Sequence, residues 1–340
     1  MGVFLSILLV VIGLAILIKG ADVLVDESSQ IAKRLNVSER VIGLTLVAFG
    51  TSFPELSISV IAAINGSDGI AIGNVVGSNI FNICVVLGVI AFIKPIAVSK
   101  SMVNKDIPMA ILTAIVLFIL LFDTIFTDAT VNQLSRADAL IFLLFFAVFL
   151  YYTFYKPDKG LISDTVIPAK AGIPSLSTVP SVQGDSRLRG NDSLTKNIIL
   201  IIVSLAGVLI GAELVVRGGS GIADSFGMSH TLIGLTIVAI GTSLPEITTG
   251  ITAVLKGKDD IAIGNIVGSC IFNVLFILGV ASLITPITLS VNILIDVTLL
   301  IAVSVFLFFT SRSKGHISKG EGIFFLVLYA AYLIYIIHRG

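Results

Sequence analysis

The chain has 340 residues, of which 56% are hydrophobic and only 12% are charged, and its formal net charge is zero. A water-soluble domain carries about 25% charged residues, so this composition excludes a soluble globule and indicates an integral membrane protein. The balanced charge gives no sign of a nucleic-acid partner.

Apolar stretches of about 20 residues, the length that crosses the hydrocarbon core as a helix, follow one another along the chain. They predict an all-α polytopic protein with ten transmembrane helices. The first stretch lacks a basic leader and a small-residue cleavage site, so it is interpreted as a span and not as a signal peptide. The predicted spans are approximately 3–25, 41–64, 70–93, 107–122, 138–155, 197–216, 232–255, 261–284, 291–310 and 321–338.

A few side chains within or beside these spans have simple interpretations. Cys84 and Cys270 lie in apolar stretches and are expected to be small buried side chains, not a disulfide. Lys19 and Asp22 are three residues apart, and snorkelling or a local ion pair is expected there in preference to a direct role in transport. Asp106 and Asp296 begin their spans and are expected at the membrane interface.

The distribution of Lys and Arg predicts the orientation of the chain. With ten spans, 17 of the 21 Lys and Arg residues fall in loops on one side, three fall on the other, and Lys19 lies within the first span. By the positive-inside rule, the rich side is cytoplasmic. We therefore expect a multi-pass protein of the inner (plasma) membrane, with both termini outside.

A polar stretch at 156–196, rich in Pro, Gly, Ser and charge, separates the fifth and sixth spans. It is predicted to be a disordered cytoplasmic linker. It divides the chain into a first five-helix repeat at 1–155 and a second at 197–340.

The two halves repeat each other. Residues 42–96 align without a gap with residues 233–287, at an offset of 191, and 31 of the 55 positions are identical. Five spans separate the copies, and because five is odd the copies must cross the bilayer in opposite directions. Inverted repeats of this kind are typical of secondary transporters, which bind their substrates near the midplane between discontinuous helices. The sequence thus predicts two inverted five-helix repeats.

Each copy contains a Gly-Thr-Ser-x-Pro-Glu block within an apolar span. Pro54 and Pro245 remove a backbone donor, so the helix should break at each block and free carbonyl groups. Glu55 and Glu246 follow these prolines, and a carboxylate at this depth costs at least about 2.5–3.5 kcal/mol. Two carboxylates in equivalent places therefore favour a functional site.

A Gly-Ser-x-x-x-Asn block follows in the next span of each half. Its hydroxyl and amide, four residues apart, share one helical face. Small and polar residues also serve helix packing in membranes, but repetition beside the Glu block favours a site. For Asn74 and Asn265, packing or capping and ion contact remain equally open. The paired residues are Ser78 and Asn82 in the first half, and Ser269 and Asn273 in the second.

The side chains in these blocks offer only oxygen ligands. An all-oxygen set without thiolate or imidazole suits hard cations. Two carboxylates balance one divalent ion or more than one monovalent ion. Ca²⁺ accepts 6–8 oxygens in flexible geometry, whereas Mg²⁺ demands a tighter octahedron, so calcium with sodium is favoured.

The paired blocks resemble those of the sodium/calcium exchanger family, prokaryotic type, within the cation/calcium exchanger superfamily, and the resemblance extends over nearly the whole chain. It implies alternating access, in which the first and sixth spans slide past a fixed core. Some members carry an acid where this chain has Asn273, and the neutral amide argues against potassium coupling. The resemblance implies ion binding by Thr51, Ser52, Glu55, Ser78, Asn82, Thr242, Ser243, Glu246, Ser269 and Asn273, and by the backbone carbonyls of Ala48 and Ala239.

The leading hypothesis is thus an antiporter that exchanges Ca²⁺ for Na⁺, with no cofactor and with the lipid bilayer as its surroundings. A Ca²⁺/H⁺ antiporter on the same fold is the alternative, because a buried Glu also binds protons. A cation channel needs no pair of carboxylates at broken helices. The buried residues offer no nucleophile beside a base, which argues against an intramembrane enzyme. A monomer would suffice, because both half-sites lie in one chain.

Overall fold

The computed structural model describes residues 3–122, 131–155, 191–226, 239–288 and 293–339, and these are mostly helical. The first half comprises α1 (Val3–Arg34), α2 (Glu39–Ile42), the π-helical η1 (Gly43–Val47), α3 (Ala48–Thr51), α4 (Phe53–Ile64), α5 (Asp68–Phe81), the π-helical η2 (Asn82–Val86), α6 (Leu87–Ile93), β1 (Ile96–Ala97), the π-helical η3 (Met102–Asp106), α7 (Ile107–Leu121), β2 (Gln133–Leu134) and α9 (Arg136–Phe154).

The second half follows the same order where it is described. It comprises α10 (Asn191–Ser225), α12 (Ala239–Thr242), α13 (Leu244–Leu255), α14 (Asp259–Phe272), the π-helical η5 (Asn273–Leu278), α15 (Gly279–Ile284), β3 (Ile287–Thr288), α16 (Ile293–Lys314), β4 (His316–Ile317) and α17 (Lys319–Arg339).

Eight helices in the described part of the chain are long and apolar enough to cross a membrane. A ninth candidate is the pair Glu39–Thr51 and Phe53–Ile64, which bends by 49° at its break. The predicted span at 232–255 includes residues that lie outside the described ones, and its described part contains α12 and α13. The count of ten spans therefore stays a prediction.

Several helices are longer than their apolar stretches. The helix α1 continues to Arg34, well past the predicted end at residue 25. Its last turns, which follow the apolar stretch, are polar and helical. The helix α10 begins at Asn191, within the stretch predicted to be a linker, and residues 156–190 of that stretch lie outside the described residues.

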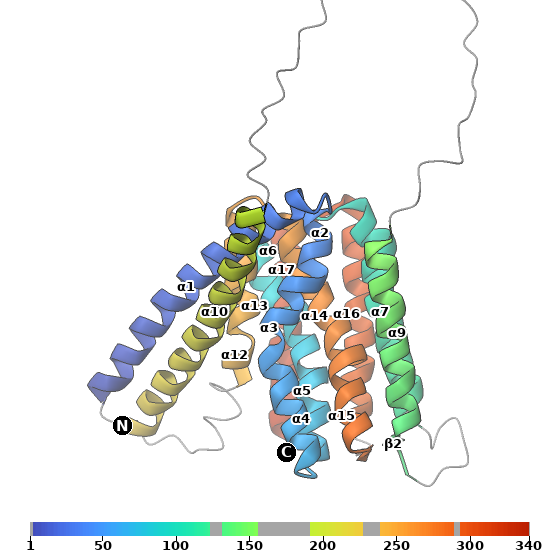
Figure 1. Ribbon diagram of the computed structural model, residues 1–340. Coiled ribbons are helices and arrows are strands. Elements are labelled where there is room, and N and C mark those ends of the chain that lie inside the picture. The colour runs from blue at the N-terminus through green and yellow to red at the C-terminus, as the bar shows by residue number, and fades with distance from the viewer. Residues whose placement is uncertain (1–2, 123–130, 156–190, 227–238, 289–292, 340) are drawn as a thin grey trace, which may run out of the picture.

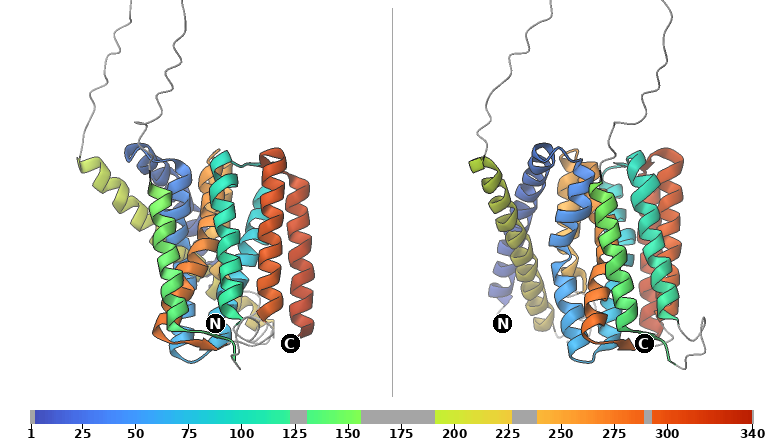
Figure 2. Two further views of the ribbon diagram at one scale, coloured as in Figure 1. Left: turned by 90° about the vertical axis from the view of Figure 1, so that its right-hand side faces the viewer. Right: turned by 45° about the vertical axis from the view of Figure 1, so that its right-hand side comes forward.

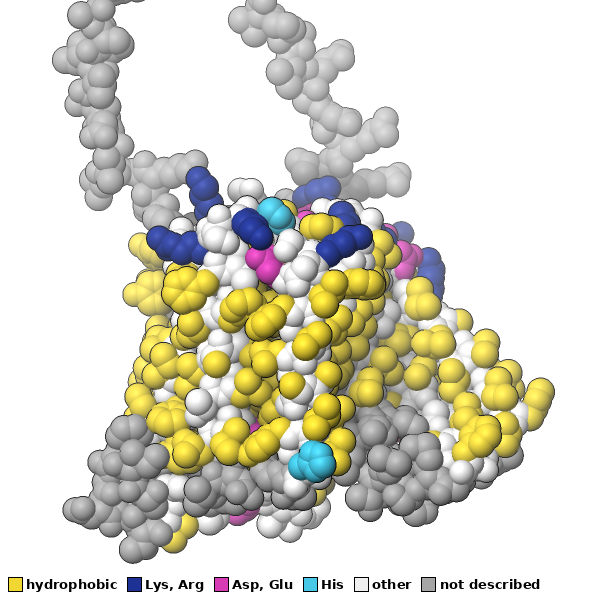
Figure 3. Space-filling view, turned by 180° about the vertical axis from the view of Figure 1, so that it is seen from behind, with side chains coloured by type: hydrophobic (Ala, Val, Ile, Leu, Met, Phe, Trp, Pro, Cys, Tyr) yellow, Lys and Arg dark blue, Asp and Glu magenta, His cyan; other side chains and the backbone are white. Residues whose placement is uncertain are grey.

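The ends of the chain and the distribution of basic residues define two sides of the molecule. The N- and C-termini lie at the same end, and the ends of α9 and α10 that flank the 156–190 stretch lie at the other (Figure 1). Lys and Arg side chains gather at that second end, above a belt of hydrophobic side chains (Figure 3). This arrangement agrees with the predicted placement of both termini on the side that is poor in basic residues.

The helices α1 and α10 form a closely packed pair. They cross one another beside the upright bundle formed by the other helices (Figure 2). A Cβ atom at Gly211 would lie 2.6 Å from the backbone nitrogen of Leu17, and one at Gly13 would lie 2.8 Å from the carbonyl oxygen of Gly211. Because only glycine permits this approach, the two backbones pack against each other directly.

The two copies of the repeat run in opposite directions. The segment from α2 through α4 descends in Figure 1, whereas α12 and α13 ascend. The sequence predicted this inversion from the odd number of intervening spans.

Equivalent contacts join the halves at both ends. The Asp259 carboxylate accepts a hydrogen bond from the backbone N–H of Ala97 at 3.0 Å, and the Asp68 carboxylate accepts one from Thr288 at 2.9 Å. The two hydrogen bonds are related by the repeat: Asp259 lies 191 residues after Asp68, and Thr288 lies 191 residues after Ala97. The same offset relates β1, which pairs with β4, to β3, which pairs with β2. Each half therefore supplies a paired strand and a carboxylate acceptor to the strand that follows the third span of the other half.

Two carboxylates expected at the membrane interface are buried in the bundle. The side chains of Asp106 and Asp296 belong to residues that are each only 4% exposed. The Arg40 guanidinium donates to both carboxylate oxygens of Asp106, at 2.7 and 2.6 Å. Asp296 accepts a hydrogen bond from the Tyr332 hydroxyl at 3.0 Å. Partners from neighbouring helices make burial possible at these positions.

Candidate functional site

Both predicted helix breaks are present. Ser52 separates α3 from α4 with φ −85° and ψ 12°, and Ser243 separates α12 from α13 with φ −96° and ψ 6°. Pro54 and Pro245 stand in the first turn of the helix that follows. Each proline lacks the N–H that would bond to the carbonyl four residues earlier, so the helix cannot run through unbroken.

The two predicted carboxylates lie just beyond these breaks. Glu55 and Glu246 stand in the first turns of α4 and α13, and each is only 1% exposed. A helix N-terminus stabilises a negative charge, and this offsets part of the free-energy cost of burying a carboxylate.

Hydrogen bonds cross between the halves at the breaks. The Ser52 hydroxyl donates to Glu246 Oε1 at 3.3 Å, and the Thr51 hydroxyl donates to Asn265 Oδ1 at 3.1 Å. The structure therefore brings residues of the first half into contact with those of the second. It buries Ala48, Thr51, Ser52, Glu55, Ser78, Asn82, Ser243, Glu246, Ser269 and Asn273, and leaves Thr242 partly buried, while Ala239 begins α12.

Several oxygens in this group have no hydrogen-bond partner. Within the described residues, five predicted site residues each have one buried oxygen that contacts no donor or acceptor. These atoms are Glu55 Oε2, Asn82 Oδ1, Glu246 Oε2, Ser269 Oγ and Asn273 Oδ1. Buried polar atoms are nearly always paired, and leaving one unpaired is costly. Both halves contribute oxygens of this kind, and carboxylate, amide and hydroxyl oxygens are the ligands that hard cations take.

Asn74 and Asn265, for which both packing and ion contact are open from the sequence, make hydrogen bonds to predicted site residues. The Asn74 amide donates to the backbone carbonyl of Glu55 at 3.1 Å and to the Ser59 hydroxyl at 2.9 Å. Asn265 accepts from Thr51. Both side chains therefore make hydrogen bonds to site residues and help to position them.

The π-helical turns are not predicted by any pattern in the sequence. The segments η2 and η5 begin at Asn82 and Asn273, and η1 ends directly before Ala48. Single π turns within α-helices are rare and occur often at functional sites, because the extra residue redirects the backbone. Here they change the helical path at the residues that carry the amide oxygens.

A cavity of about 430 Å³ reaches the site from the side of α5, α16 and α17. Ser78, Thr242 and Ser243 line it, together with the buried Asp296. The rest of its lining is mainly apolar and aromatic, with Phe81, Tyr329 and Tyr332, so Asp296 is the one acid among the described residues that line it.

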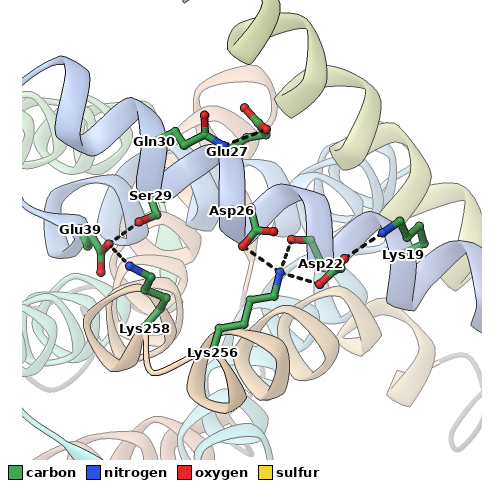
Figure 4. A network of polar contacts seen from close by, with 9 residues as sticks. All are labelled: Lys19, Asp22, Asp26, Glu27, Ser29, Gln30, Glu39, Lys256 and Lys258. Atoms are coloured by element: carbon green, nitrogen blue, oxygen red, sulfur yellow. Dashed lines mark hydrogen bonds and ion pairs between the residues drawn. The ribbon is translucent and has the colours of Figure 1, made fainter. Parts of the chain in front are cut away.

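Ion pairs join α1 to the turn between α13 and α14 (Figure 4). The Lys256 ammonium contacts Asp22 Oδ1 at 2.5 Å and Asp26 Oδ1 at 2.8 Å, and it donates to the carbonyl oxygen of Asp22 at 2.9 Å. Lys19 pairs with Asp22 at 3.0 Å, as the sequence predicted. We call the contacts of Lys256 with Asp22 and Asp26 the α1 tie.

The repeat does not reproduce the α1 tie on α10. The position equivalent to Lys256 is Asn65, and the position equivalent to Asp26 is Arg217. Arg217 pairs instead with Glu213 on the same helix, at 2.6 Å. The tie, which joins the two halves, therefore has no counterpart between α10 and the turn that follows α4, and it lies at the end rich in basic residues.

Comparison with known proteins identifies relatives over nearly the whole chain. The family described as "Sodium/calcium exchanger protein" matches residues 5–155 and 196–338. The sodium/calcium exchanger MaX1 of Methanosarcina acetivorans is 32% identical over 97% of this chain and 97% of its own length. The inner membrane protein YrbG of Escherichia coli is 34% identical over 82% of this chain and 79% of its own.

The fold is also that of a solved transporter. A structure of the sodium-calcium exchanger NCX_Mj, soaked with 10 mM Na⁺ and no Ca²⁺, superposes with a TM-score of 0.79 and 32% sequence identity. The match covers 98% of this chain and 99% of the other. A second structure of the same exchanger, soaked with Na⁺ and Sr²⁺, gives a TM-score of 0.78.

Proposed function

Because the chain belongs to the sodium/calcium exchanger protein family, we propose that it is a secondary antiporter that exchanges Ca²⁺ for Na⁺ by alternating access. One observation carries the proposal: both halves contribute buried oxygens without partners, and these include one oxygen of each of the two carboxylates at the broken helices. Such a set matches the hard-oxygen coordination and the charge of a calcium ion.

The site residues are proposed to be those that the sequence indicated. Glu55 and Glu246 supply the formal charge, and the amides, the hydroxyls and the carbonyls at the breaks supply neutral oxygens. Na⁺ also accepts oxygen ligands, so the same residues can bind the two ions in alternation. Ca²⁺ and Na⁺ are the transported substrates of this site.

A Ca²⁺/H⁺ antiporter is the alternative, since a buried Glu can exchange a proton for a cation. The Ser52 hydroxyl bonds to Glu246, which gives a sodium ion neutral oxygen beside the carboxylate. This contact favours Na⁺ as the counter-ion. A channel is disfavoured because a continuous pore does not require two buried carboxylates at broken helices.

The test is ⁴⁵Ca²⁺ uptake into proteoliposomes that contain the full chain. Vesicles loaded with Na⁺ and diluted into Na⁺-free buffer should accumulate Ca²⁺, and vesicles with only a pH gradient should not. Uptake driven by the pH gradient alone would establish the Ca²⁺/H⁺ alternative and overturn the Na⁺ coupling.

The proposal extends to the setting of the protein. Ten spans in two inverted repeats in the inner (plasma) membrane would place both termini outside the cell and the 156–196 stretch in the cytoplasm. Both half-sites lie in one chain, so a monomer would be sufficient for exchange.

Alternating access would require α1 and α10 to move against the rest, and the α1 tie bears on that motion. It forms in the conformation described here and joins α1 to the end of α13. Partial burial acts to lower the pKa of Lys256, but the hydrogen bonds to Asp22 and Asp26 raise it by more. The pKa therefore lies above its usual value, and the ammonium stays charged at neutral pH.

Replacing Lys256 by Met should therefore shift the protein away from this conformation. The pair is partly exposed and screened, so we expect a loss of about 1 kcal/mol, or about fivefold in the ratio of the two conformations. Distances between spin labels on Ile18→Cys and Leu255→Cys would report the shift, because Cys84 and Cys270 are buried. Lys100→Met removes an exposed charge that has no contact with α1 and is the control. Equal distance distributions in Lys256→Met and the parent chain would refute this role.

A further inference from the structure

The repeat breaks its symmetry at one position next to the site. Within the Gly-Ser-x-Ile-Phe-Asn block the two halves differ only at x, which is Asn79 in the first half and Cys270 in the second. Both residues are buried, Asn79 at 1% exposed and Cys270 at 4%. They face each other: the Asn79 amide donates to the Cys270 carbonyl at 3.0 Å, and the Cys270 thiol lies 3.9 Å from the Asn79 carbonyl.

The orientation of the Asn79 amide follows from its hydrogen bond to the Cys270 carbonyl. A backbone carbonyl can only accept, so the atom of Asn79 that faces Cys270 must be the nitrogen. The oxygen of Asn79 then points the other way, and it accepts a hydrogen bond from Asn273 Nδ2 at 2.9 Å. The Asn273 amide is thereby fixed in turn, with its nitrogen toward Asn79.

The oxygen of Asn273 is one of the buried oxygens without a partner. Rotating this amide would place the Asn273 oxygen against the Asn79 oxygen, two acceptors about 3 Å apart with no hydrogen between them. The equivalent Asn82 has no such neighbour in the described residues, because Cys270 stands where an amide would be needed. One of the two amide oxygens is thus held in place by a side chain, and the other is not.

We propose that Asn79 is a positioning residue, which holds the Asn273 oxygen toward the cation and makes position 273 selective for a neutral amide. The proposal rests on the proposed ion site. An ionised Asp at 273 could only accept, so it would face the Asn79 oxygen without a hydrogen bond. Asn79 thereby keeps the charged groups of the central site to Glu55 and Glu246.

The test is equilibrium binding of ⁴⁵Ca²⁺ to the purified full chain, which does not depend on transport. Asn79→Cys installs the residue that the repeat already accommodates at position 270, and it removes the acceptor for Asn273. Loss of a residue that orients a metal ligand costs about 10–100-fold in affinity, and we expect a loss of affinity in this range. Cys270→Ala removes the opposite side chain but keeps its carbonyl, and it should leave affinity unchanged within about twofold.

A second comparison separates positioning from packing. Asn273→Asp should bind Ca²⁺ poorly in the parent chain, and the double variant Asn79→Cys with Asn273→Asp should bind at least about tenfold better than Asn273→Asp alone. Additive losses would overturn the proposal, as would an unchanged affinity in Asn79→Cys. Absence of Ca²⁺ binding by the parent chain would overturn the proposal together with the site. Ca²⁺ binding without Na⁺-driven uptake would overturn only the exchange function, and the variants would still decide the role of Asn79.

Discussion

Replacing Glu246 by Gln is expected to abolish Ca²⁺ binding and Na⁺-driven uptake while leaving the ion-free protein at least as stable as the parent. Glu246 is 1% exposed, and its Oε2 has no partner among the described residues. Removing one member of a buried charge pair costs about 3–5 kcal/mol, which here means at least about a hundredfold in Ca²⁺ affinity. A neutral amide is less costly to bury without an ion, so the empty protein should not lose stability.

Two measurements on the same variant would check this expectation. The first is ⁴⁵Ca²⁺ binding, and the second is thermal unfolding in detergent with and without Ca²⁺, because a bound ion stabilises the folded state. The Ca²⁺-induced rise in Tm should disappear in Glu246→Gln and in Glu55→Gln. Glu213→Gln is the matched control, since Glu213 is exposed and pairs with Arg217 on the same helix. Ca²⁺ binding retained in both Glu246→Gln and Glu55→Gln would place the ion elsewhere.

Replacing Asp106 by Asn is expected to give a large loss of stability without a direct effect on ion binding. The Arg40 and Asp106 side chains are only 14% and 6% exposed, and the guanidinium contacts both carboxylate oxygens. Removing the acid leaves a buried guanidinium without its partner, which costs about 3–5 kcal/mol.

The decisive comparison is between single and double variants. Asp106→Asn should unfold at a clearly lower temperature, and Arg40→Met combined with Asp106→Leu should recover most of the loss, because no unpaired charge remains. Unfolding temperatures in detergent without added Ca²⁺ would show the difference. If the double variant were no more stable than Asp106→Asn, the ion pair would not be the cause of the loss.

Much of the fold can be predicted from the sequence, because membrane-spanning helices need long apolar stretches and break at proline. Prolines and carboxylates marked the broken helices, and the repeat predicted the inversion seen in α4 and α13. Hydropathy placed the helix ends less well. It ended the first span near residue 25, although α1 continues through Asp26 to Arg34, because helices extend beyond the hydrocarbon core where water and ion pairs satisfy their side chains.

The sequence proposes the residues of the site, but it does not reveal their geometry. Sequence spacing puts Ser78 and Asn82 on one helical face, yet it does not reveal the π turn that begins at Asn82. Asp106 was expected at the membrane interface, and its burial depends on Arg40, which lies 66 residues away in the sequence. Asn79 had one visible signal, the mismatch with Cys270 in an otherwise matching block. Its meaning required the contact with Asn273, which joins the two halves.

The reciprocal capping by Asp68 and Asp259 has a consequence for the ancestry of the chain. Each half lends a carboxylate to the strand of the other, so a half standing alone would lack the acid that binds its own strand. A second copy packed in the opposite direction would supply it, as in a closed two-fold dimer. The internal repeat and the exchanged carboxylates are the features that a fusion of two antiparallel copies of one ancestral half would produce. After that fusion each copy could diverge, as the change between Asn79 and Cys270 shows, without losing its partner.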